Sequence, residues 1–145
     1  MGVRRRARIL AFQALYAWDV GSARREDLVD FDWYEAPPEE TEADRTAVLT
    51  FARLLVEGTL EQIASVDESI KTHLSNWGFD RIGKTDLAIL RISAFGLLYA
   101  RDIPATVTID EAVELARQFA GNDSFRFING VLDGIHHDQR ETAPS

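Results

Sequence analysis

The chain has 145 residues, enough for one domain or for two small subdomains that share a core. Hydrophobic residues make up 46% and charged residues 28%, which excludes a disordered or fibrous protein. The absence of cysteine excludes disulfide bonds, a thiol nucleophile and a thiolate metal site. No apolar stretch has the length of a transmembrane helix or a secretory signal, so we expect a soluble, cytoplasmic protein.

The net charge of −8 is distributed unevenly. An acidic segment, residues 26–44, holds nine acidic residues and no Lys or Arg, whereas the rest of the chain has 15 acidic and 16 basic residues. The N-terminus is basic, with Arg4, Arg5, Arg6 and Arg8 preceding every acidic side chain. Because local fields govern association, the negative total does not exclude nucleic acid as a partner.

In chain order, the first predicted helix runs from about Arg4 to Asp19, with apolar side chains spaced three and four apart on one face. Gly21 ends it, and residues 22–35 are predicted to contain a short second helix, which ends before Pro37. A long third helix is predicted from Asp44 to His73, because one apolar seam continues through the whole stretch.

Residues 85–99 are apolar at almost every position, which is typical of a helix buried among its neighbours. They are therefore the predicted central core helix. After the break at Pro104, Thr108 and Glu111 form a predicted capping box that starts a helix running to Ala120.

The last helix is predicted to begin at Asp123 or Ser124 and to end near His137. No stretch shows the alternation of a strand, so the predicted fold class is all-α, a helical bundle. The predicted parts are an N-terminal helical subdomain over residues 1–75, a C-terminal helical subdomain over residues 76–137, and a disordered tail over residues 138–145.

Motifs for catalysis are missing from the sequence. It contains no glycine-rich phosphate loop, no nucleophile elbow and no zinc-binding motif. His136 and His137 are adjacent, so in a helix they point about 100° apart and cannot readily share a metal ion. We therefore expect no enzyme activity, no metal and no cofactor.

One face of the first helix carries side chains suited to RNA. Arg5, Arg8, Phe12 and Tyr16 lie within about 80° of one another, opposite the apolar face. Guanidinium groups bind phosphates, and aromatic rings stack on unpaired bases. The alternative is that Phe12 and Tyr16 pack against another helix while the arginines form a solvated end. The residues alone favour neither.

A series of motifs resembles the NusB family of bacterial transcription antitermination factors. The motifs are Arg4-Arg5-Arg6-Ala7-Arg8, Gln13-Ala14-Leu15-Tyr16, Leu90-Arg91-Ile92, Ile103-Pro104, residues 109–116, Asp123-Ser124 and residues 127–133. Together they span roughly residues 4–133, and the segment Phe-Ile-Asn-Gly-Val-Leu-Asp at residues 127–133 is the most specific of them.

The resemblance implies two packed helical subdomains without enzymatic activity. It implies binding to single-stranded boxA RNA of ribosomal RNA leaders, together with the ribosomal protein NusE, in the RNA polymerase antitermination complex. Some relatives form homodimers that cover the RNA face. By position, the resemblance assigns RNA contacts to Arg4, Arg5, Arg6, Arg8, Gln13, Tyr16, Asp123, Arg126 and Phe127, and NusE contacts to Asp80 and Asp86.

Several alternatives stay open. Asp123 is either an RNA contact or a plain N-cap, and Phe127 is either exposed or buried in the core. The acidic segment matches no family motif, and it would repel RNA if it lay near the arginines. It lies instead on the far side, or it contacts a basic partner. The rival function is a helical protein–protein scaffold, a homodimer or partner-helix binder without RNA contact.

Overall fold

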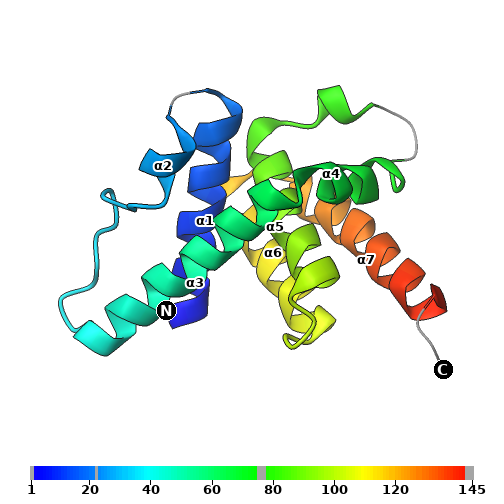
Figure 1. The fold of residues 1–145 in the computed structure, drawn as a ribbon. Coiled ribbons are helices and arrows are strands. Elements are labelled where there is room, and N and C mark those ends of the chain that lie inside the picture. The colour runs from blue at the N-terminus through cyan, green and yellow to red at the C-terminus, as the bar shows by residue number, and fades with distance from the viewer. Residues whose placement is uncertain (1, 22, 75–77, 143–145) are drawn as a thin grey trace.

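The computed structural model describes residues 2–21, 23–74 and 78–142, with side chains as far as Arg140. These residues form helices and no strand, which confirms the all-α prediction (Figure 1). None of the helices described is both long and apolar enough to cross a membrane. The elements are α1 (Val3–Asp19), α2 (Arg25–Leu28), α3 (Glu42–Glu61), α4 (Ile63–Lys71), the 3-10 helix η1 (Phe79–Arg81), α5 (Lys84–Tyr99), α6 (Ala105–Phe119) and α7 (Ser124–Thr142).

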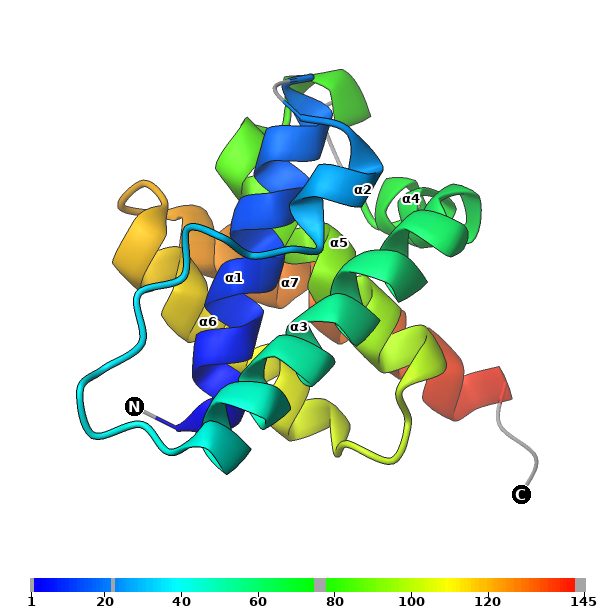
Figure 2. The same ribbon diagram turned by 60° about the vertical axis from the view of Figure 1, so that its left-hand side comes forward.

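Helix α5 is the centre of the bundle, as its apolar sequence predicts. It packs against α1, α3, α4, α6 and α7, which surround it in Figures 1 and 2. Every residue from Leu87 to Leu97 is buried. A helix enclosed on all faces can bury this much apolar surface, and that burial is the main stabilising contribution to the fold.

The predicted helix over residues 44–73 is wrong as a single helix. It divides at Gln62, whose backbone (φ −107°, ψ 23°) leaves the helical region, so α3 packs on α1 and α5 while α4 packs on α5 and α7. The apolar seam nevertheless stays buried on both sides of the break. Gly58 marks a close helix contact, because a Cβ there would clash with the Phe95 ring.

The predicted capping box of Thr108 and Glu111 is also wrong. Helix α6 begins at Ala105, and Pro104, four residues before Thr108, occupies the N-cap position. Proline favours a helix start because its φ is preset and it has no N–H to leave unsatisfied. Thr108 is therefore a buried residue inside the helix, and Glu111 is available for a partner elsewhere.

The prediction of a disordered tail is wrong for residues 138–142, which continue α7. Two side-chain contacts fasten these last turns. Asp138 pairs with His73 of α4 at 2.8 Å, and Gln139 donates to the Leu97 carbonyl of α5 at 2.9 Å. Residues 143–145 lie outside the described residues. The division into subdomains at residue 75 stays a prediction.

The acidic segment begins in the short helix α2, which covers Arg25–Leu28 of the predicted stretch 22–35, and ends in the first turn of α3. From there the chain passes along α1 before α3 begins, as Figure 2 shows. Leu28 and Phe31 are buried and anchor it to the core. Phe31 has a φ of 50°, a left-handed conformation that turns the chain at this anchor.

Candidate RNA interface

Arg4 and Arg8 both lie over the Phe51 ring of α3, 4.8 and 5.4 Å from its centroid. Arg8 is only 7% exposed, and this burial lowers the pKa of its guanidinium. Phe12, one turn further, is also buried, with its ring 4.9 Å from that of Phe119. Of the two alternatives for this face, packing against a neighbouring helix is therefore confirmed for Phe12, and Arg8 is buried as well, because α3 and α6 each place a ring against it.

Arg5 reaches the opposite neighbour, α6. Its Nε and Nη2 donate to the two carboxylate oxygens of Glu111, each at 3.0 Å. This bidentate bond raises the pKa of Arg5 and lowers that of Glu111. The Arg5 side chain is 42% exposed, and its Nη1 has no partner among the described residues. A phosphate can therefore bind Nη1 while the ion pair stays intact.

Arg6 contacts the acidic segment. Its Nη2 donates to Glu40 Oε1 at 3.0 Å, and the Tyr34 hydroxyl donates to the same oxygen. The Arg6 and Glu40 side chains are 15% and 2% exposed, so this is a largely buried ion pair. Burial and the hydrogen bond to Glu40 raise the pKa of Tyr34. The acidic segment therefore lies against the arginine helix, and not on the far side of the molecule.

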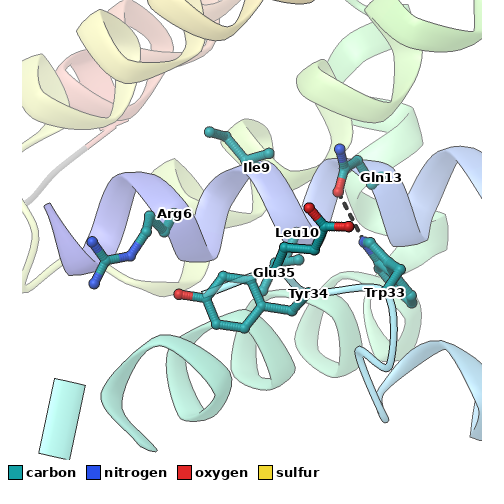
Figure 3. A pocket seen from close by; sticks show the side chains of 7 residues that line it. All are labelled: Arg6, Ile9, Leu10, Gln13, Trp33, Tyr34 and Glu35. Atoms are coloured by element: carbon teal, nitrogen blue, oxygen red, sulfur yellow. Dashed lines mark hydrogen bonds between the residues drawn. The ribbon is translucent and has the colours of Figure 1, made fainter. Parts of the chain in front are cut away.

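Gln13 joins the same segment to the middle of α1. Its Oε1 accepts a hydrogen bond from the Trp33 indole at 2.9 Å, the dashed line of Figure 3. Tyr16, one turn along, is 41% exposed and therefore lies outside the buried core. Together with Phe12, Thr85 and Phe119, these two α1 residues line an open hollow of about 260 Å³.

The second predicted RNA region, at the start of α7, is the more open of the two. Asp123 and Arg126 are both largely exposed, whereas Phe127 is half-buried and packs against the core. The guanidinium groups of Arg117 and Arg126 lie 4.7 and 5.3 Å from the centroid of the Phe125 ring. Sequence reasoning missed Arg117 and Phe125, because they belong to different helices and no periodicity connects them.

The two residues assigned to NusE differ in setting. Asp80 is exposed in η1, whereas Asp86 is half-buried and accepts a hydrogen bond from the Ser124 hydroxyl at 3.0 Å. Burial raises the pKa of Asp86, and the bond from Ser124 opposes that shift. Asp86 thus connects the first turn of α5 to the first turn of α7. Its contact with NusE stays a prediction, as does that of Asp80.

The chain is similar to known proteins in both sequence and fold. The model of the NusB family matches residues 5–137. The transcription antitermination protein NusB of Treponema pallidum is 51% identical over 132 residues, which are 91% of each chain. The structure of T. maritima NusB is similar with a TM-score of 0.77 at 30% identity, over 97% of this chain and 93% of that chain. A complex of NusB and NusE with double-stranded RNA contains a chain of the same fold, with a TM-score of 0.76 at 24% identity, over 94% of this chain and 97% of that one.

Proposed function

Because the chain belongs to the NusB family, whose members are non-enzymatic transcription antitermination factors, we propose that it binds single-stranded boxA RNA of ribosomal RNA leaders together with NusE. It does so as part of the RNA polymerase antitermination complex, in the cytoplasm. The related NusB that was solved with NusE and RNA supports this choice of partners.

One observation carries the proposal. The two RNA regions assigned by resemblance are far apart in sequence, but a hollow beside the first is also lined by a residue that closely precedes the second. Phe119 at the end of α6 lines the same hollow as Tyr16 of α1, and only three residues separate it from Asp123. A single strand that stacks on Tyr16 can therefore continue to the open start of α7.

The chemistry of this surface divides into two kinds of contact. Arg4, Arg5 and the largely exposed Arg126 supply charge for phosphates, which positions a strand without reading its sequence. Tyr16 and Asp123 supply a ring and a hydrogen-bond acceptor for bases. Arg6 and Arg8 offer phosphates less accessible charge than the sequence implies. Arg6 is paired with Glu40, and Arg8 is buried.

The experiment is a titration of labelled boxA RNA at several salt concentrations, with and without NusE. Each phosphate contact to single-stranded RNA should contribute a slope of about −0.7 to log affinity against log salt. Arg4, Arg5 and Arg126 together should therefore give a slope of roughly −2. A double-stranded competitor of the same sequence should bind more weakly. If the protein binds NusE but has no affinity for RNA, the alternative function as a protein–protein scaffold replaces the proposed RNA-binding function.

A further inference from the structure

A second hollow lies on α1 beside the one that holds Tyr16. It measures about 280 Å³, and its lining residues, shown in Figure 3, are Arg6, Ile9, Leu10, Gln13, Trp33, Tyr34 and Glu35. This volume is just below the range of roughly 300–1,000 Å³ typical of small-molecule sites. The hollow therefore admits a group the size of a nucleobase and no folded partner.

Trp33 is held rigidly in this hollow. Its ring packs edge-on against buried Phe31, with centroids 5.5 Å apart, and its Nε1 donates to Gln13. The side chain nevertheless remains 38% exposed. An aromatic ring that is fixed in orientation and open to solvent is a platform on which an unpaired base can stack at little entropic cost.

The polar groups of the hollow suit an uncharged ligand. Arg6 and Tyr34 both bond to Glu40, which compensates the positive charge, and exposed Glu35 disfavours a phosphate. Gln13 turns its amide oxygen to Trp33 and its amide nitrogen away, as Figure 3 shows. That nitrogen has no hydrogen-bond partner among the described residues, so two N–H groups are free to bind the edge of a base.

From these contacts we infer that the Trp33 hollow is a nucleobase subsite, in which an unpaired base of the bound RNA stacks on Trp33. The inference rests on the proposed RNA-binding function. Gln13 lines both hollows and lies one helical turn from Tyr16, so a strand stacked on Tyr16 can place a neighbouring base on Trp33. Gln13 then donates to a base edge at the border between the two hollows.

The test uses Trp33→Ala and a set of single-stranded boxA RNAs, each with one abasic nucleotide at a different position. Stacking on a base is worth about 1–3 kcal/mol, so Trp33→Ala should weaken binding of intact RNA by roughly 5- to 150-fold. One abasic position should weaken wild-type binding similarly and should have little further effect on the variant. In Tyr16→Ala, an abasic nucleotide at a different, nearby position of the RNA should have little further effect on affinity.

Two controls separate stacking from folding. Trp33→Phe keeps a ring against Phe31, so it should retain the position-specific abasic effect even if Trp33→Ala folds poorly. Leu54→Ala removes an exposed apolar side chain of α3 outside the hollow and should leave RNA affinity unchanged.

The outcomes are distinguishable. The subsite would be overturned if Trp33→Ala lost as much affinity as the wild type at every abasic position. It would also be overturned if Trp33→Ala bound intact RNA as tightly as the wild type, or more tightly. In each case Trp33 would only anchor the acidic segment or screen it from the RNA. If Tyr16→Ala still loses affinity in that case, the proposed function stands. If the wild-type protein with NusE binds no boxA RNA, both proposals fail together.

Discussion

Replacing Glu40 by Gln tests the contact between the acidic segment and the arginine helix. The substitution removes the Glu40 carboxylate from its largely buried ion pair with Arg6. Removing one partner of a buried pair costs about 3–5 kcal/mol, and because Gln still offers one acceptor we expect about 3 kcal/mol. For a chain of this length, this loss corresponds to a fall in melting temperature of roughly 10 °C.

The same substitution should affect RNA binding in the opposite direction. Arg6, no longer paired with the Glu40 carboxylate, should bind a phosphate more readily, so the salt slope for boxA RNA should steepen by up to about 0.7. The matched control is Glu39→Gln, which changes the same net charge in the same segment at an exposed side chain. Calorimetry gives the melting temperatures of both variants, and salt titration gives their slopes for boxA RNA. Equal melting temperatures and equal slopes for the two variants would refute the buried pair.

Two further predictions concern packing and pH. Gly58→Ala should destabilise the protein by about 1–3 kcal/mol, because the added Cβ clashes with Phe95. Gly130→Ala should stabilise it by about 0.5–1 kcal/mol, because the Cβ there meets nothing within 4 Å. Equal shifts in the melting temperatures of the two variants would contradict this. Because burial raises the pKa of Asp86, its ionised form opposes folding at neutral pH. Asp86→Asn should thus be at least as stable as the wild type at neutral pH. Chemical denaturation should show the difference in free energy of unfolding between the two proteins shrinking as the pH falls through the raised pKa of Asp86. A difference that grows as the pH falls would contradict this.

The helices were predictable where hydrophobic periodicity and burial agree. The unbroken apolar run of α5 can be satisfied only in the centre of a bundle, and the structure places it there. The break at Gln62 was not predictable, since the apolar seam continues through it without a change of spacing. A pattern of Thr and Glu three apart also occurs inside helices, so Thr108 gave a false capping signal.

The site was less predictable than the fold, because its geometry depends on contacts between distant residues. Arg5 and Glu111 are 106 positions apart, and the partner of Arg6 lies in a segment without a family motif. Charged side chains are normally exposed, so nothing in the sequence indicated that Arg8 is buried over Phe51. The RNA-binding roles assigned by resemblance stay predictions, whereas the position of each side chain is now defined.

The central claim is that α1 and the start of α7 form one RNA surface. The most direct test is the affinity for boxA RNA, with NusE present, of Tyr16→Ala and Arg126→Ala, compared with Arg140→Ala, an exposed arginine near the other end of α7. The account predicts a loss of roughly 5- to 150-fold for Tyr16→Ala, a salt slope reduced by about 0.7 for Arg126→Ala, and a smaller effect for Arg140→Ala. Wild-type affinity in Tyr16→Ala, or equal effects of the two arginine substitutions, would contradict it.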